Sequence, residues 1–314
     1  MSKSGIKDRL GRTIDYLRLS VTDKCNLNCE YCRHSETAGA QILTFEEIER
    51  IVNLFAKCGI RKIRLTGGEP LVREDILEII GICRKPKEVK DVALTTNGIL
   101  LKGMAAKLKA AGLDRVNISI DSLSAGKYKR IARADSLGHA LEGVDAAMDA
   151  GLAPVKINTV LMHGINDDEI DDLIKLAENR DVQVRFIEYM PMGKHHEGRY
   201  ISLSEIISER PYLKKASESA GVETLYRIDG YKGLVGFITP VSRPFCENCN
   251  RIRITPDARI RHCLGNNMEA DLRGILKEND ETAEKLIRET IAKKPERGFC
   301  GGFETNRGMG SIGG

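Results

Sequence analysis

Six cysteines stand in two short-spaced groups, and such spacing is typical of protein ligands to metal. They are Cys25, Cys29 and Cys32 in the first group (C-x3-C-x2-C), and Cys246, Cys249 and Cys263 in the second. Iron–sulfur clusters are held by thiolates, usually four to a cluster, whereas each group here supplies three. A cluster with three protein thiolates keeps one iron open to an outside ligand, and the compact first group favours this chemistry.

Structural zinc is the alternative at both groups, because zinc also accepts three cysteines and one histidine. His34 follows Cys32 by only two residues, which is an awkward reach around one ion, so iron–sulfur is favoured there. For the second group taken alone, a zinc ribbon completed by His262 is the better interpretation. The adjacent histidines His195 and His196 could also bind a metal, although a solvent-exposed loop is the simpler interpretation of this pair.

The elements that must position these cysteines alternate between strand-like apolar runs and helical patterns. The strand-like runs lie at 16–20, 62–66, 91–95, 115–120, 155–160 and 183–187. Helical patterns lie near 76–84, 104–111, 137–150 and 169–179, and the clearest begins at Thr44, where Glu47 completes a capping box. Six alternations predict an α/β fold with a parallel sheet, a partial (β/α)6 TIM-type barrel.

This rhythm ends after about residue 204. Residues 226–239 have the pattern of short strands with glycine turns and 251–254 that of a strand, whereas 269–277 and 281–293 have helical patterns. We therefore expect two domains: a core barrel at 1–225, and a smaller region at 226–314 that carries the second cysteine group and packs on the open side of the barrel.

Alternation along the expected strands separates an apolar face from a polar one. The polar face carries Arg18, Ser20, Lys62, Arg64, Thr66, Asn117, Ser119, Asp121, Lys156 and Asn158. Helical crossovers cover the outer face of a parallel barrel, so this polar set should line the lumen; a sheet with one solvated face is the alternative. Because buried unpaired cations are costly, the pattern predicts a ligand cavity rich in positive charge.

The overall composition sets wide limits on the partners. Lys and Arg number 49 and Asp and Glu 45, and the resulting charge of +4 is too small to argue for nucleic acid. No run of about 18 apolar residues occurs, and the N-terminus lacks the apolar stretch of a secretory signal. We expect a cytoplasmic protein with reduced cysteines, bound to neither membrane nor nucleic acid.

The cysteine loop and a second motif together resemble the radical S-adenosylmethionine (SAM) superfamily. Tyr31 stands before the last cysteine of the loop, and the Gly67-Gly68-Glu69 run after the second strand is similar to that superfamily's GGE motif. Over residues 8–314 the chain also resembles the GTP 3′,8-cyclase family of molybdenum cofactor biosynthesis. The markers are the segments at 17–23, 94–98 and 185–188, both cysteine groups, and the terminal Ile312-Gly313-Gly314.

The resemblance implies two 4Fe-4S clusters, the first activating SAM and the second helping to hold guanine. Contacts with SAM are implied for Tyr31, Gly68, Ser119 and Met190. Contacts with GTP are implied for Arg18, Arg64, Thr95, Lys156, Arg251, Ile252 and Arg253, and strand alternation adds Lys62. The implied reaction removes the ribose 3′ hydrogen of GTP and joins C3′ to C8, giving (8S)-3′,8-cyclo-7,8-dihydroguanosine 5′-triphosphate. No side chain is assigned to catalysis itself.

Implied partners are an electron donor, a cyclic pyranopterin monophosphate synthase that receives the product, and a second copy in a homodimer. Two segments depart from the family's pattern: the short loop at 33–35, and residues 298–302, in which Cys300 has no assigned role. The longer stretch at 298–314 contains seven glycines. Composition predicts that this stretch is a flexible tail, whereas the resemblance implies that its end reaches the active site.

Two other functions remain open. One is a radical SAM enzyme that modifies peptides or sugars with an auxiliary cluster, which would normally carry more cysteines. The other is a non-catalytic iron–sulfur or zinc regulator, which needs neither the GGE motif nor a cation-lined lumen.

Overall fold

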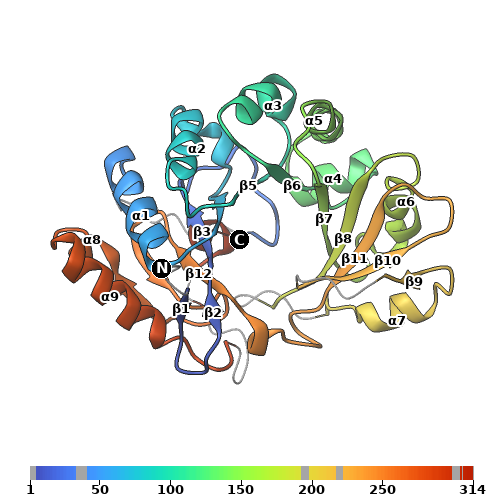
Figure 1. Ribbon diagram of the computed structural model, residues 1–314. Coiled ribbons are helices and arrows are strands. Elements are labelled where there is room, and N and C mark those ends of the chain that lie inside the picture. Colours follow the sequence, from blue (N-terminus) through green and yellow to red (C-terminus); the bar gives the residue numbers. More distant parts are fainter. Residues whose placement is uncertain are drawn as a thin grey trace.

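The structure is a computed structural model that describes residues 5–32, 41–191, 198–216, 222–298, 305 and 307–313. These residues form one twelve-stranded sheet, in the order β14-β13-β12-β3-β4-β5-β6-β7-β8-β11-β10-β9, and a separate two-stranded hairpin. Figure 1 shows the sheet curved into an open barrel with helices around its outer side. The loop at 33–35, the 195–196 pair and Cys300 lie outside the described residues.

Six parallel strands in sequence order form the centre of the sheet. They are β3 (Tyr16–Ser20), β4 (Lys62–Thr66), β5 (Asp91–Thr96), β6 (Arg115–Ser119), β7 (Val155–Leu161) and β8 (Val182–Glu188). The predicted partial (β/α)6 barrel is confirmed, with strand ends within a residue or two of those expected.

Helices cross over between these strands on the outer side. They are α1 (Phe45–Cys58), α2 (Ile76–Arg84), α3 (Leu101–Ala110), α4 (Ala125–Ala132), α5 (Leu137–Asp149) and α6 (Ile170–Lys175). The Thr44–Glu47 capping box is present at the start of α1. Helix α6 is shorter than the predicted 169–179, because Glu169 belongs to a 3-10 turn and the chain leaves the helix after Lys175 in a series of turns. Helix α4 was not predicted.

The part of the chain after β8 extends the sheet at both of its edges. At one edge β12 (Arg251–Ile254) pairs in parallel with β3, and β13 (Arg259–Arg261) and β14 (Glu269–Asp271) follow antiparallel. At the other edge β11 (Leu234–Ile238) pairs in parallel with β8, and β10 (Thr224–Arg227) and β9 (Lys214–Lys215) follow. The prediction of helix at 269–271 was wrong, because pairing with β13 outweighs local propensity. The domain boundary after residue 225 stays a prediction.

The remaining elements flank this sheet. They are β1 (Ile6–Lys7), β2 (Thr13–Ile14), α7 (Leu203–Ser208), α8 (Leu272–Ile275), α9 (Asp280–Ala292), α10 (Met309–Ile312) and 3-10 turns at Pro70–Val72 and Cys246–Asn248. Helix α9 confirms the pattern predicted at 281–293. Cys58 in α1 and Cys83 in α2 are buried core residues. None of the helices described has the length and apolar character needed to cross a membrane.

Candidate active site

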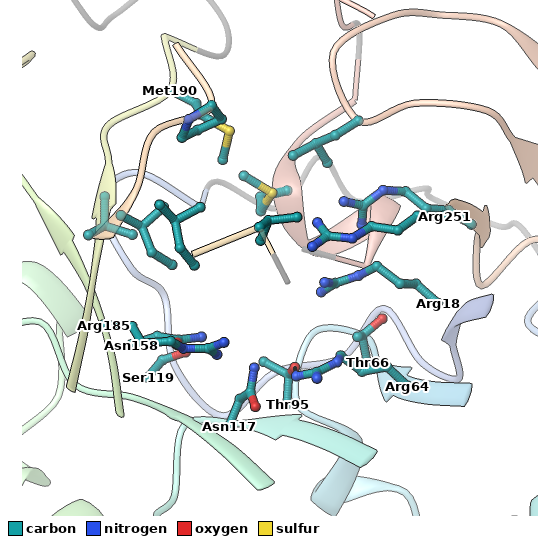
Figure 2. A pocket seen from close by; sticks show the side chains of 18 of the residues that line it. Arg18, Arg64, Thr66, Thr95, Asn117, Ser119, Asn158, Arg185, Met190 and Arg251 are labelled. Carbon is teal, nitrogen blue, oxygen red and sulfur yellow. Dashed lines mark hydrogen bonds between the residues drawn. The ribbon is translucent and has the colours of Figure 1, made fainter. Parts of the chain in front are cut away.

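The barrel lumen holds a cavity of about 700 Å³ that both cysteine groups border. Of the polar strand face predicted to line it, nine side chains do so: Arg18, Lys62, Arg64, Thr66, Asn117, Ser119, Asp121, Lys156 and Asn158. Ser20, the tenth, is buried where Gly313 passes over it. Figure 2 shows Arg18, Arg64 and Arg251 extending into the same space.

The residues predicted to bind cofactor or substrate also border this cavity, with one exception. Besides the strand residues above, the lining includes Tyr31, Gly68, Thr95, Met190, Arg251 and Arg253. Ile252 is the exception, because alternation along β12 turns its side chain into the hydrophobic core, where it is fully buried. Its side chain is therefore turned away from the cavity, and only its backbone could meet a ligand there. The ligand that each residue contacts stays a prediction.

The first cysteine group occupies the loop after β3, in surroundings that disfavour a bare thiolate. Burial, together with nearby Asp121 and the neighbouring thiols, raises the pKa of Cys29 and Cys32, the latter to about 12. A hydrogen bond from the backbone of Gly310 opposes this rise at Cys32. Three thiols gathered where their ionised forms lack a counter-charge fit a site completed by a metal cluster.

Within the described ranges, no three His, Cys, Asp or Glu side chains gather around a single metal-ion position. A four-iron cluster binds each thiolate through a different iron atom, so its ligands need not converge on one point.

Two buried carboxylates border the cavity near this loop. Burial raises the pKa of Glu69 to about 7, and the carboxylate accepts hydrogen bonds from the backbone of Asn97 at 2.7 Å and from Thr96 Oγ1 at 2.8 Å. Burial raises the pKa of Asp121 to about 6, and its Oδ2 accepts a 2.7 Å hydrogen bond from the Tyr31 hydroxyl. This end of the cavity is therefore acidic.

Gly68 explains how the GGE loop reaches the cysteine loop. A Cβ at this position would lie 2.3 Å from the carbonyl oxygen of Lys24, and the Gly68 N–H donates to the Thr22 carbonyl at 2.9 Å. Glycine is needed here because the two backbones meet with no room for a side chain.

The other end of the cavity is strongly basic. Over the whole cavity, ten of the described lining residues are Lys or Arg and three are Asp or Glu, and two of these three are Glu69 and Asp121 at the acidic end. Burial, and then the charge of Arg251 beside it, lower the pKa of Arg253 to about 10. Burial and then Arg253 lower the pKa of Arg18. A polyanion that forms hydrogen bonds with several of these guanidiniums at once would offset the repulsion between their positive charges.

Tyr16 lies among these guanidiniums, and their positive charges lower the pKa of its phenol. Burial alone would raise the pKa of its phenol, but Arg64, Arg18 and Arg251 bring it down to about 7. Arg64 Nε donates to the phenol oxygen. The Arg251 guanidinium lies 5.8 Å from the Tyr16 ring centre and 5.2 Å from that of Phe245, which fixes its direction.

Several lining residues were not among the predicted ligands. Arg185 donates to Asn158 Oδ1 at 2.9 Å, and Glu223 pairs with Lys156 at 3.0 Å and with Arg185 at 3.7 Å. Burial would raise the pKa of Glu223, but these cations lower it to about 2. Arg185 follows the strand alternation that located its neighbours, whereas nothing in the local sequence marks Glu223.

The second cysteine group has the opposite electrostatic surroundings from the first. Burial would raise the pKa of Cys249, but Lys294 and then Arg251 and Arg253 lower it below its usual value. Lys294 also donates to the Arg251 carbonyl at 2.9 Å. His262, the fourth ligand in the zinc alternative, has Nε2 2.6 Å from the Thr290 carbonyl. This group fits a cluster that shares its pocket with an anion.

Two family models match the chain, the Radical SAM superfamily at residues 19–177 and Molybdenum Cofactor Synthesis C at residues 182–300. The fold is similar to that of SuiB from Streptococcus suis, with a TM-score of 0.60 and 14% identity over 90% of this chain and 66% of that one. The SAM-bound SuiB structure gives a TM-score of 0.57 and 15% identity over 89% and 68%. The match of the family model at residues 19–177 makes the protein a member of the radical SAM superfamily.

Relatives of nearly equal length narrow this assignment. The GTP 3′,8-cyclase of Petrotoga mobilis is 42% identical over 98% of this chain and 99% of its own length. That of Marinobacter nauticus is 44% identical over 95% and 94%. The chain belongs to the GTP 3′,8-cyclase family.

Proposed function

We propose that this protein converts GTP to (8S)-3′,8-cyclo-7,8-dihydroguanosine 5′-triphosphate in molybdenum cofactor biosynthesis. The supporting observation is a single cavity with two ends of opposite charge, each beside three cysteines. Glu69 and Asp121 border the acidic end, and Arg251 and Arg253 the basic end. SAM carries a sulfonium and an ammonium group, whereas GTP carries about four negative charges, so each ligand matches one end.

The first cysteine group would hold the 4Fe-4S cluster that, when bound, cleaves SAM and supplies the radical for hydrogen abstraction. The chain itself provides position. Asp121 holds the Tyr31 hydroxyl at 2.7 Å, which fixes this ring beside the cysteine loop. Gly68 keeps the neighbouring backbone close, and Ser119 and Met190 border the same space. These four residues are the proposed SAM contacts.

The basic end would hold the triphosphate through charge-assisted hydrogen bonds. The proposed contacts are Arg18, Lys62, Arg64, Thr95, Lys156, Arg251 and Arg253, all on the cavity wall. Binding the phosphates here sets the ribose and base between the two cysteine groups. The second group, which would hold the other 4Fe-4S cluster, borders this space through Cys246, Cys249 and Cys263. Fixing the reacting parts in this way is the main contribution that a protein makes to cofactor chemistry.

The proposal also includes the partners of the protein, its oligomeric state and its location in the cell. A reductant would supply the electrons, and a cyclic pyranopterin monophosphate synthase would take the product. A homodimer and a cytoplasmic location complete the proposal; reduced cysteines suit that compartment.

The decisive experiment is anaerobic incubation of cluster-reconstituted protein with dithionite, SAM and GTP deuterated at C3′. We expect the cyclised nucleotide, and 5′-deoxyadenosine that carries the deuterium. The C25A/C29A/C32A variant should form neither product. Deoxyadenosine without deuterium and without the nucleotide product would reject GTP as substrate and reopen the peptide- or sugar-modifying alternative.

A further inference from the structure

The described end of the chain lies inside the barrel, although its glycine content predicts a free tail. Figure 1 marks this end on the concave side of the sheet. In α10, Ile312 is fully buried, and Met309 and Gly310 border the cavity. The carbonyl of Gly313 accepts a hydrogen bond from Arg253 Nη1 at 2.6 Å.

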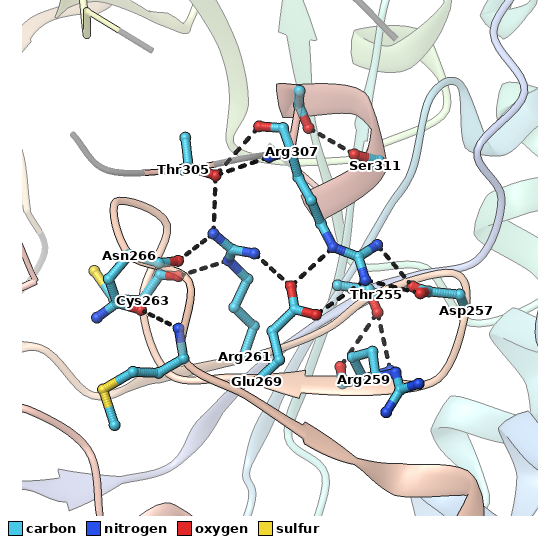
Figure 3. A network of polar contacts seen from close by, with 12 residues as sticks. Thr255, Asp257, Arg259, Arg261, Cys263, Asn266, Glu269, Thr305, Arg307 and Ser311 are labelled. Carbon is cyan, nitrogen blue, oxygen red and sulfur yellow. Dashed lines mark hydrogen bonds and ion pairs between the residues drawn. The ribbon is translucent and has the colours of Figure 1, made fainter. Parts of the chain in front are cut away.

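Arg307 ties this tail to the hairpin of β12, β13 and β14 (Figure 3). Its Nη1 and Nη2 donate to the two carboxylate oxygens of Asp257 at 3.1 and 2.8 Å. Its Nη2 and Nε also lie 2.9 Å from the two oxygens of Glu269. All three side chains are largely shielded from solvent, being 16 to 19% exposed. One guanidinium therefore holds two carboxylates, an arrangement that a lysine cannot reproduce.

Glu269 extends the connection to the second cysteine group. It lies opposite Arg261 in the β13–β14 register, and the two side chains form an ion pair. Arg261 is fully buried; its Nε donates to the Cys263 carbonyl at 3.1 Å and its Nη2 to Thr305 Oγ1 at 2.9 Å. A single carboxylate thus joins the arginine beside a cluster ligand to the arginine of the tail.

We propose that Asp257, Arg261, Glu269 and Arg307 form a tail latch that positions residues 309–313 in the active site. None of the four borders the cavity, so they are positioning residues and touch neither cofactor nor substrate. The latch holds Gly310, whose backbone forms a hydrogen bond with Cys32 of the first cysteine group, and Gly313, whose carbonyl accepts one from Arg253. Its part in turnover rests on the proposed function; its part in ordering the tail does not.

The first test uses protein without clusters and measures hydrogen–deuterium exchange of the peptide that covers 307–313. We expect R307Q to raise the exchange rate of these amides by about tenfold or more, because losing the latch permits local opening. R307K should keep only part of the wild-type protection of these amides, so its exchange rates should lie between those of the wild type and of R307Q. R259Q is the matched control: Arg259 is on the same hairpin, but it pairs with Asp271 at 3.6 Å at an exposed position. The R259Q variant should exchange like the wild type.

The second test compares cyclised nucleotide formed per 5′-deoxyadenosine in the reconstituted proteins. R307Q should lower this ratio by about tenfold or more while SAM cleavage continues, because a misplaced tail disturbs the geometry of the reacting groups. E269Q should also lower this ratio. The free-energy cost in the double variant E269Q/R307Q should be smaller than the sum of the costs in the two single variants, since the two residues are in contact. R259Q should keep the wild-type ratio.

The outcomes separate the two proposals. If the wild type forms no cyclised nucleotide, the proposed function fails and the exchange data alone judge the latch. If the wild type is active and R307Q matches it in exchange and product ratio, the latch is wrong. Should R307Q fail to fold, as judged by circular dichroism, D257N and R307K decide the question by the same exchange measurement, and wild-type exchange in both would overturn the latch.

Discussion

The Arg253 guanidinium donates a hydrogen bond to the Gly313 carbonyl at 2.6 Å, which joins a buried strand to the last described residue of the chain. Arg253 is also one of the cations proposed to bind GTP. A guanidinium has five N–H donors, so it can hold a phosphate oxygen and the tail carbonyl together. Substrate binding and tail position are therefore expected to depend on one side chain.

Arg253→Ala should weaken GTP binding by about 1.5–3 kcal/mol, the usual contribution of a charged hydrogen bond. The dissociation constant, measured anaerobically by equilibrium dialysis, should rise about 10- to 100-fold. SAM cleavage without GTP should continue, because Arg253 lies at the basic end of the cavity. Arg253→Lys keeps the positive charge but loses the paired N–H donors of the guanidinium. Its dissociation constant for GTP should therefore lie between those of the wild type and of Arg253→Ala. Unchanged affinity in the alanine variant would show that the basic end binds a different ligand.

Both cysteine groups should carry iron. Anaerobically reconstituted protein should bind about eight irons per chain, as two clusters of four. Replacing Cys25, Cys29 and Cys32 together with alanine should leave about four irons and abolish deoxyadenosine formation. Elemental analysis after anaerobic purification is the check, and zinc at the second group would contradict the two-cluster assignment and favour the ligand set with His262.

The Tyr16 phenol should titrate near neutral pH in the protein without clusters, since the neighbouring guanidiniums bring its pKa to about 7. Tyrosinate absorbance is easy to follow here, because the chain has eight tyrosines and no tryptophan. Tyr16→Phe should remove the low-pH step alone. Bound GTP or inorganic triphosphate should raise this pKa, because its negative charges offset the guanidiniums. A first tyrosine transition near pH 10 in the free protein would contradict this account of the basic end.

Local geometry explains why much of the site could be predicted from the sequence. Strand alternation is a short-range property, so it predicts that Arg18, Arg64 and Lys156 face the lumen without any knowledge of the strand order. Tyr16 lies on the same face of β3 as Arg18, but an aromatic residue in an apolar run gives no sign of a polar role. Lys294 acts at the site from a distant part of the chain, just beyond α9.

Long-range pairing explains why local sequence patterns gave wrong predictions for residues 269–271 and for the tail. Residues 269–271 have a helical pattern, yet Glu269 faces Arg261 across a hairpin. The same carboxylate then holds Arg307. The glycines of the tail therefore predict flexibility, because the side chains that hold it stand 38 to 60 positions earlier, where no local pattern reveals them.

Gly313 should be intolerant of any side chain, for two independent reasons. Its φ of +78° is a left-handed conformation, and a Cβ would lie 2.4 Å from Thr66 Oγ1. Gly313→Ala, or deletion of the last two residues, should leave both clusters and GTP binding largely intact. SAM cleavage should continue while cyclised nucleotide falls about a hundredfold, since errors of about 1 Å in positioning can cost that much.

Gly11→Ala is the control for backbone strain alone, because Gly11 has a φ of +79° with nothing within 4 Å of an added Cβ. Thr66→Ala removes the atom that an added Cβ would strike, and Thr66 Oγ1 is a buried group without a hydrogen-bond partner among the described residues. The double variant T66A/G313A should therefore recover part of the cyclisation that Gly313→Ala loses. Normal product formation by both Gly313→Ala and the truncated protein would mean that the tail end has no part in ordering the site.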